Sequence, residues 1–308
     1  MIAFSRFTGY FNAIIEHGSI RKAADALHVS ASAIDRQILQ AEEALGAPLF
    51  ERMSGGLRPT AAGEVFVALV REWQRDYRRA LTQIDELQGL RRGHVDIAII
   101  DALTQSFVAP VIATLAKERP GLTVGVRVLD NEAVAQSTAS GDVDFGLMLN
   151  PRSMKDLEVR RSIDAPLGIA FRPGHAFEAR KEVRLSQSLD ERLIVPAAPL
   201  VIHEHVAALF RRSEIDIQRF MACNNTHMMR SLVDHDVGVA VLCWLDVASD
   251  VASGKLGFRK LKDAHVEPLR LHLCVAPRRQ LSHAATEVLR YVEAGMRDAH
   301  TPRSISGR

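Results

Sequence analysis

The sequence predicts an α/β protein with an all-α N-terminal region, and three observations indicate this fold class. Apolar residues recur at helical spacing through most of the first 93 residues. Beyond Gly93, short β-rich apolar runs alternate with amphipathic helical stretches, which is typical of sheets flanked by helices. The chain of 308 residues is 47% apolar and 25% charged, which is enough to bury the cores of roughly two domains.

Composition narrows the class of protein further. No apolar run approaches the roughly 20 residues that a membrane-spanning helix needs, and the N-terminus lacks the apolar stretch of a signal peptide. We therefore expect a cytoplasmic protein with no membrane partner. Cys223, Cys243 and Cys274 lie far apart in the sequence and fit small buried hydrophobic residues. The net charge of +2 indicates neither the presence nor the absence of nucleic-acid binding.

Three helices are predicted in the first sixty residues. They cover residues 4–17, residues 20–27 after the capping residue Ser19, and the stretch between the capping residues Ser30 and Gly46. The last two helices are short and joined by a tight turn, so they form a helix-turn-helix. The second helix of such a pair can lie in the major groove of DNA when its outward face offers donors and acceptors.

The outward face of the third helix is polar. At 100° per residue, and with Ile34 on the buried side, this face carries Ser32, Arg36, Leu39, Gln40 and Glu43, with Asp35 and Gln37 at its edges. Arginine can bind guanine and glutamine can bind adenine in bidentate fashion. Ser19, Arg21 and Lys22 suit phosphate at the start of the preceding helix. A solvated face on a structural three-helix cluster explains the helical pattern equally well.

The residues around and after the third helix favour DNA binding. The informative ones are Gly18-Ser19, Ala23-Ala24 with Leu27, Ser30 to Ile38, Glu42-Glu43 with Leu45-Gly46, Leu49-Phe50 with Arg52, and Leu57 with Pro59 to Gly63. In these motifs residues 4–63 resemble the winged helix-turn-helix of LysR-type transcriptional regulators.

The resemblance implies roles for individual residues and a double-stranded DNA partner. Arg36 and Gln37 would face DNA, and Arg52 and Arg58 would flank a wing at residues 54–56 that reaches the DNA backbone or the minor groove. Ser30 and Thr60 complete the candidate DNA-binding residues. The DNA-binding domain is expected at residues 1–60.

Two positions depart from the usual pattern of the family, Ala31 and Asp35. The Asp35 carboxylate lies near the phosphates in any DNA complex, where it can weaken non-specific binding or accept a hydrogen bond from cytosine N4. It can also simply pair with Arg36 or Arg58, which is the alternative we favour from the sequence.

A long linker helix is predicted from Thr60 to about Gln88, as a separate segment at residues 61–90. Its apolar stripe follows a coiled-coil period through Phe66, Val70, Trp73, Tyr77, Ile84 and Leu87. We expect a second copy of the chain to cover this stripe, giving a homodimer or homotetramer with two recognition helices one turn of DNA apart, or a multiple of it. The alternative is packing against the chain's own C-terminal domain.

The remaining chain predicts two-lobed α/β architecture with mainly parallel sheets. Strand-like runs occur at residues 95–100, 123–129, 144–149, 168–171, 193–196, 219–222, 238–242 and 269–276. Weaker family resemblance at residues 118–122, 141–146 and 233–242 implies an effector-binding domain similar to periplasmic binding proteins. It would cover residues 94–298, with lobe one at 94–161 and 269–298, lobe two at 162–268, and a disordered tail at 299–308.

In that architecture, loops after strand ends line the ligand cleft. The candidate effector-binding residues are Thr104, Ser106, Leu149, Asn150, Leu200, His203, Thr226 and His227. Hydroxyl and backbone N–H groups at a helix start would suit a ligand carboxylate. Plain helix capping explains Thr104, Ser106 and Thr226 equally well, and core or surface packing is favoured for the others.

The sequence shows no machinery of an enzyme. His203 and His205 are spaced wrongly for two metal ligands on one helix face, and nucleotide-binding loops and nucleophile elbows are absent from the sequence. We therefore expect no catalysis, no cofactor and no metal. The prediction is a LysR-type regulator that binds a roughly palindromic operator and responds to an unidentified small-molecule effector, with RNA polymerase as a further partner that the resemblance allows. An α/β binding protein or enzyme with an assembly helix, and a DNA-binding protein without a ligand, stay as alternatives.

Overall fold

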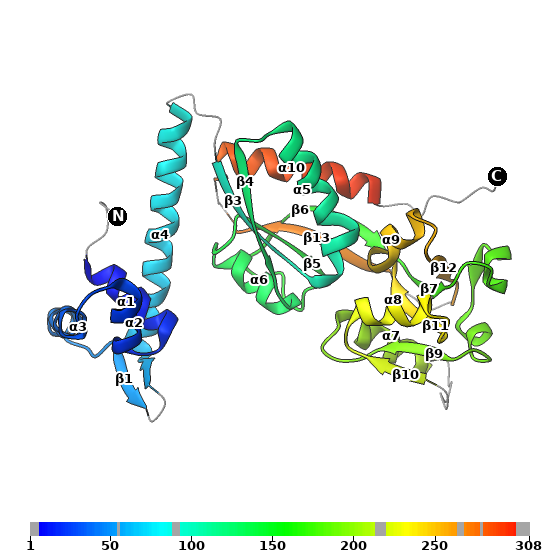
Figure 1. Cartoon of the computed structure of the whole chain (residues 1–308), viewed down its shortest axis with the longest axis horizontal. Coiled ribbons are helices and arrows are strands. Elements are labelled where there is room, and N and C mark those ends of the chain that lie inside the picture. Colours follow the sequence, from blue (N-terminus) through cyan, green and yellow to red (C-terminus); the bar gives the residue numbers. More distant parts are fainter. Residues whose placement is uncertain are drawn as a thin grey trace. The chain divides into compact units, whose positions relative to one another are not determined.

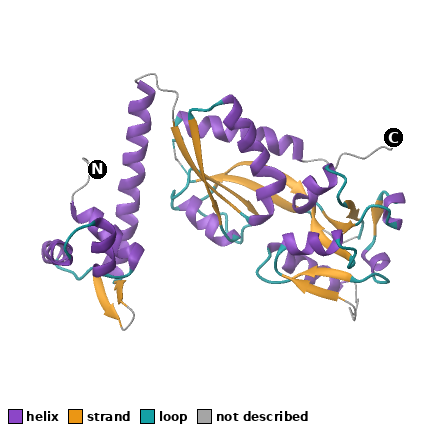
Figure 2. Ribbon diagram, in the orientation of Figure 1, coloured by secondary structure: helices purple, strands orange, loops and turns teal. Residues whose placement is uncertain are grey.

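The computed structural model describes residues 6–53, 56–87, 93–212, 220–263, 268–277 and 280–299. They belong to two compact units, Met1–Ile84 and Asp85–Arg308, which we call the N-terminal unit and the C-terminal unit. The N-terminal unit is helical apart from one small hairpin, whereas the C-terminal unit alternates strands and helices (Figures 1 and 2). The expected change of fold class along the chain is therefore confirmed.

Three helices pack together at the start of the N-terminal unit. They are α1 (Arg6–His17), α2 (Ile20–Leu27) and α3 (Ala31–Leu45). The Ser30 side chain caps α3 by accepting a hydrogen bond from the backbone N–H of Ala33, and Gly46 ends the helix with φ 67°. Ser19 occupies the N-cap position of α2, but its side chain makes no capping hydrogen bond. Phe11, Ile14 and Ile34 fill the core between the helices.

The hairpin of the N-terminal unit consists of β1 (Phe50–Met53) and β2 (Gly56–Pro59), paired antiparallel. The backbone N–H of Leu57 donates to the carbonyl of Gly18 at 2.8 Å, which anchors the hairpin on the end of α1. A Cβ at Gly56 would lie 2.4 Å from that same carbonyl, so only glycine fits. Residues 54 and 55 of the expected wing lie outside the described residues.

The linker helix α4 spans Ala61–Leu87, as expected. Thr60 caps it by accepting from the backbone N–H of Gly63 at 3.1 Å. Its apolar stripe has a buried part and an exposed part. In the buried part, Val70 is 1% exposed in the core of the N-terminal unit and Phe66 packs edge-on against Phe11. The expectation that both contact a partner copy is therefore wrong for Val70 and is weakened for the half-buried Phe66.

The exposed part of the stripe begins beyond Val70. Trp73 is 41% exposed and Ile84 is 48% exposed, with the half-buried Tyr77 between them. The side chain of Leu87 lies outside the described residues. Among the described side chains of the stripe, the exposed ones therefore lie along the C-terminal half of α4.

The C-terminal unit contains two sheets, and we call each sheet with its helices a lobe. The first lobe has the strand order β4 (Leu122–Val128), β3 (Gly93–Ile99), β5 (Phe145–Leu149), β13 (Leu269–Val275) and β6 (Glu158–Ala165). Its helices are η1 (Asp101–Leu103), η2 (Thr104–Val108), α5 (Ala109–Glu118), α6 (Asn131–Ala139) and α10 (His283–Ala299).

The second lobe has the strand order β10 (Phe220–Cys223), β9 (Leu193–Pro196), β11 (Val239–Cys243), β7 (Leu167–Phe171), β12 (Gly257–Leu261) and β8 (Glu182–Val183). Its helices are η3 (Ala176–Ala179), η4 (Leu185–Ser188), α7 (Val201–Arg212), α8 (Thr226–Asp234) and α9 (Trp244–Ala252). The chain enters this lobe after β6 and returns to the first lobe at β13.

The sheets differ from the expectation in two ways. They are mixed rather than mainly parallel, because β13 runs antiparallel to β5 and β6, and β7 runs antiparallel to β11 and β12. The strand β6 pairs with β13 as far as Ala165, so the crossover follows Ala165 and not residue 161. A strand that returns from another lobe needs no right-handed crossover helix and can pair in either direction.

Three strands, β6, β8 and β12, were not expected from the sequence. The sequence of β6, Glu158–Ala165, contains few apolar residues because this edge strand is largely exposed. β12 mixes Arg259 and Lys260 with apolar residues, and β8 has only two residues. Such segments give no apolar run, so hydrophobic patterning alone misses them.

The remaining expectations concern membranes, cysteines and the ends of the chain. Within the described residues, none of the helices combines the length and hydropathy needed to cross a membrane. Cys243 and Cys274 are buried, as expected, and Cys223 is half-buried. The expected tail begins with Ala299, which ends α10, and residues 300–308 lie outside the described residues, as do residues 88–90 of the expected linker.

Candidate functional site

The exposed side of α3 carries the residues expected to read DNA, and we call it the recognition face. Ser32, Arg36 and Gln40 are exposed, and Asp35 and Gln37 are half-buried at its edges. Ile34 is completely buried on the opposite side of the helix, and Ile38 is 5% exposed. In Figure 1, α3 lies on the side of the N-terminal unit away from α4. The helix therefore presents its polar side outward within its own unit.

Some side chains on the recognition face bind one another. The Ser32 hydroxyl donates to Ser30 Oγ at 3.2 Å, and the Gln37 amide donates to Gln40 Oε1 at 3.0 Å. These contacts are short-range along one helix, so they orient the side chains without burying them. Both glutamines keep further donors and acceptors for a partner.

Asp35 and Arg36 have no such contacts. Among the described residues, no hydrogen bond or ion pair joins either side chain to another group, and the pairing of Asp35 with Arg36 or Arg58 that we favoured does not form. Glu42 on the same helix behaves differently, because its carboxylate accepts from the backbone N–H of Leu49 at 2.6 Å. The two acidic residues are therefore not equivalent.

The other candidate DNA-binding residues surround this helix. Arg21 and Lys22 are exposed in the first turn of α2, and Ser19 before them is half-buried. Arg52 and Arg58 are exposed on β1 and β2. Thr60 stands apart, because its hydroxyl donates to the carbonyl of Pro48 at 2.6 Å besides capping α4. Its side chain is therefore committed to the fold of the unit.

Three of the candidate effector residues, Asn150, Ser106 and His227, make contacts where the two lobes of the C-terminal unit meet. Asn150 follows β5 with φ 37° and bonds to His205 of α7 at 3.2 Å, from Nδ2 to Nε2. Its Oδ1 also accepts from the backbone N–H of Arg270 at 2.7 Å. Asn150 therefore connects the first lobe to the second.

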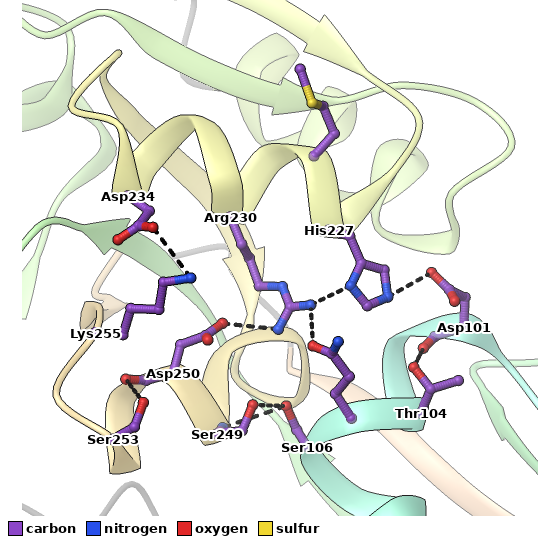
Figure 3. A network of polar contacts seen from close by, with 12 residues as sticks. Asp101, Thr104, Ser106, His227, Arg230, Asp234, Ser249, Asp250, Ser253 and Lys255 are labelled. Atoms are coloured by element: carbon purple, nitrogen blue, oxygen red, sulfur yellow. Dashed lines mark hydrogen bonds and ion pairs between the residues drawn. The ribbon is translucent and has the colours of Figure 1, made fainter.

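A second connection between the lobes is a network centred on Arg230 of α8 (Figure 3), which we call the Arg230 network. The guanidinium donates to Asp250 Oδ2 at 2.8 Å and to Gln105 Oε1 at 2.7 Å. It also donates to Nδ1 of His227, whose Nε2 lies 3.5 Å from Asp101 Oδ2. Asp101 and Gln105 belong to the first lobe, so the network joins both lobes.

Arg230 is 8% exposed, and its Nε is buried without a partner among the described residues. A buried guanidinium is tolerated because both of its terminal nitrogens have hydrogen-bond partners. The network is therefore a desolvated polar contact rather than a surface ion pair.

Helix capping, one of the two alternatives for Thr104, Ser106 and Thr226, does not describe these three hydroxyls. Ser106 Oγ lies 3.0 Å from Ser249 Oγ of α9, which adds a contact between the lobes. Thr104 donates to the carbonyl of Asp101 at 2.8 Å. Thr226 is 4% exposed, and Asn225 rather than Thr226 caps α8 by accepting from the backbone N–H of Met228.

The other candidate effector residues serve the fold of their own lobe. Leu149 is 2% exposed, and its backbone N–H and carbonyl both bond to the Asn131 side chain. His203 donates from Nδ1 to the carbonyl of Pro196 at 2.9 Å. Leu200 is half-buried at the start of α7. These contacts agree with the core or surface packing favoured from the sequence.

Sequence reasoning missed Arg230, Gln105, Asp250 and His205. A signal for Arg230 was present, because it lies on the buried face of α8 with Thr226, Met229 and Val233. An arginine on the apolar stripe of a helix indicates a buried ion pair. The partners could not be found in the same way, because 125 residues separate Gln105 from Arg230.

A buried carboxyl and a buried thiol of the C-terminal unit have raised pKa values. Burial raises the pKa of the Asp246 carboxyl to about 7, although the backbone N–H of Cys243 and the charge of Arg230 act in the opposite direction. Burial also raises the pKa of the Cys274 thiol to about 11, so this thiol stays protonated. Within the described residues, no group of three or more His, Cys, Asp or Glu side chains is placed to hold a metal ion.

Models of two protein families match this chain. The model described as "LysR substrate binding domain" matches residues 88–297, and the model described as "Bacterial regulatory helix-turn-helix protein, lysR family" matches residues 7–64. Together they cover both units of the structure.

Similar proteins with established names are also regulators. The chain is 23% identical to the HTH-type transcriptional activator CmpR of Synechocystis sp. over 92% of this chain and 93% of CmpR. It is 22% identical to the transcriptional activator protein LysR of Escherichia coli over 79% of this chain and 78% of that protein.

Two solved structures share the fold. A full-length OxyR variant from Pseudomonas aeruginosa matches with a TM-score of 0.67 and 17% identity, covering 99% of both chains. Full-length CbnR in complex with its target DNA matches with a TM-score of 0.64 and 19% identity, covering 96% of this chain and 99% of CbnR.

Proposed function

This chain belongs to the LysR family of bacterial transcriptional regulators, and from that premise we propose that it binds a roughly palindromic DNA operator through the recognition face of α3. The observation that carries the proposal is the outward, polar side of a helix whose opposite side is buried in its own unit. Arg36 and Gln40 would contact base edges, and Arg21, Lys22, Arg52 and Arg58 would contact the backbone. Because the proposed partner is DNA, we propose that the protein acts in the cytoplasm.

We further propose that the C-terminal unit binds a small-molecule effector between its lobes. Asn150 and the Arg230 network already join the lobes, so an effector that prefers one arrangement would act by adding to these bonds or replacing them. A shift in the lobe arrangement is a physical route by which a ligand can change the placement of DNA-binding units. The proposed role is regulation rather than catalysis.

The operator geometry that we propose requires two copies of the chain. A palindromic site presents two equivalent half-sites, and a two-fold dimer places one recognition helix on each. Trp73 and Ile84 on the exposed half of α4 offer an apolar surface for the second copy. A homotetramer would need a second, different contact between two such dimers.

A salt titration of DNA binding tests the proposal. The full-length chain is first used to enrich duplexes from a random pool, and its affinity for an enriched duplex is then measured at increasing salt concentration. Several phosphate contacts predict a steep fall in affinity with salt. Arg36→Ala should lower the affinity for the enriched duplex by about 1–3 kcal/mol and bring it close to that for unrelated duplexes.

The matched control is Arg152→Ala, which removes an arginine whose side chain is 81% exposed on the C-terminal unit. This variant should bind as the wild type does. Equal, weak binding of wild type and Arg36→Ala at every salt concentration would contradict the proposed function.

A further inference from the structure

We propose that Asp35 determines specificity by accepting a hydrogen bond from the N4 amino group of a cytosine in the major groove. This inference rests on the proposed function, and it assigns a base to a residue that departs from the usual family pattern. It starts from an observation about contacts. Asp35 lies on the rim of the recognition face, and its carboxylate has no partner among the described residues.

A structural role does not explain this carboxylate. Ser30 already caps α3, and Asp35 is the fifth residue of the helix, beyond the first turn where a negative charge interacts well with the helix dipole. Glu42 shows what a structural carboxylate looks like on this helix, because it accepts from the backbone N–H groups of Leu49 and Phe50. Asp35 makes no equivalent contact.

The position of Asp35 places it close to base edges. The N-terminal residues of a recognition helix contact the bases, and Asp35 lies in the second turn of α3 beside Arg36. At 100° per residue it is about 60° from Ser32 around the helix axis, on the same outward half. Its short side chain therefore lies at the rim of the side that enters the groove when Ser32 and Arg36 face the bases.

The chemistry of the groove selects the base. A carboxylate only accepts hydrogen bonds, and the major groove offers two amino donors, cytosine N4 and adenine N6. Adenine presents the N7 acceptor next to its amino group, which repels a carboxylate, whereas cytosine presents its amino group alone. Cytosine is therefore the base that suits Asp35, close to the base pair that Arg36 contacts.

The test compares the sequences that variants of the full-length chain enrich from a random duplex pool. Wild type should enrich sites with a position at which cytosine is preferred about tenfold over other bases. Asp35→Ala should remove the preference at that position alone, and Asp35→Asn should change it to adenine, because asparagine binds adenine in bidentate fashion. Positions read by Arg36 should keep their preference in both variants.

The control is Asp25→Asn, which removes an exposed negative charge from α2 in the same unit. It should raise affinity for all duplexes alike and leave every base preference unchanged. If Asp35→Asn does only the same, Asp35 acts through its charge and the inference is wrong. If wild type enriches no sequence at all, both the proposed function and this inference are wrong. If Asp35→Ala keeps the cytosine preference, only this inference is wrong.

Discussion

The recognition face and the junction of the lobes use similar polar side chains in opposite ways. On α3, Arg36 is exposed and has no partner among the described residues. At the junction, Arg230 is 8% exposed and donates to an aspartate, a glutamine and a histidine. A side chain without internal partners, such as Arg36, can bind another molecule without first breaking hydrogen bonds of its own. At the junction, a ligand that enters must replace existing hydrogen bonds between the lobes, so its binding can change the lobe arrangement.

The largest effect that would test this contrast is expected from Arg230→Ala. It should lower the free energy of unfolding of the C-terminal unit by about 3–5 kcal/mol, because Asp250 and Gln105 lose a buried partner. Urea unfolding of the full-length chain measures this value. Arg36→Ala is the matched variant and should change stability by less than about 0.5 kcal/mol. Equal effects of the two variants would remove the distinction between the surfaces.

A pH dependence should follow from Asp246. Its folded-state pKa of about 7 exceeds the usual 3.8, so the folded protein binds the proton more tightly than the unfolded chain does. The stability that this proton contributes is complete below pH 4 and is lost as pH rises towards 7. Asp246→Asn should lack this loss. Its free energy of unfolding relative to that of wild type should therefore rise by on the order of 3 kcal/mol between pH 4 and pH 8.

Unfolding of wild type and Asp246→Asn over this pH range measures the difference. A constant difference between wild type and Asp246→Asn across the range would show that Asp246 does not titrate as the structure indicates.

A smaller effect is expected from the contact between Asn150 and His205. A double-mutant cycle with Asn150→Ala and His205→Ala should give a coupling of about 1 kcal/mol, because one hydrogen bond joins the lobes there. Saturating effector, once found by its thermal stabilisation of the protein, should change this coupling if the lobes rearrange. An unchanged coupling would mean that the bond plays no part in the response.

The smallest effect on stability is expected on the recognition face itself. Gln40→Ala removes the contact with Gln37 and should cost about 0.2–0.5 kcal/mol in thermal unfolding. The same variant should weaken binding to an enriched duplex more than it weakens the fold. A stability loss larger than the loss of DNA affinity would indicate that Gln40 is structural.

The N-terminal unit was largely predictable from the sequence. Its helices are specified by neighbours in the chain, such as the cap at Ser30 and the glycine at residue 46, and by an apolar period that places Ile34 inward. Arg36 and Gln40 then had to face outward, because three or four residues span one turn. The direction of side chains along one helix is a local property.

The C-terminal unit was predictable only in part. Most strands were found from their apolar runs, but the antiparallel placement of β13 and the polar strand β6 were missed. The candidate effector residues fell close to the junction of the lobes, yet its central residue, Arg230, was not among them. The hydrophobic period and the composition of a segment do not indicate which distant segments of the chain it contacts.

The amino-acid order alone therefore determined the helix-turn-helix, its outward polar side and the alternation of strands and helices, since each depends on residues within one or two helical turns. Tertiary structure decided which part of the α4 stripe stays open, because Phe11 of a distant helix covers Phe66. It also decided that Arg230 joins the lobes, because folding brings Gln105 and Asp250 within 3 Å of its guanidinium. Contacts of that kind arise from packing in three dimensions, which no local pattern encodes.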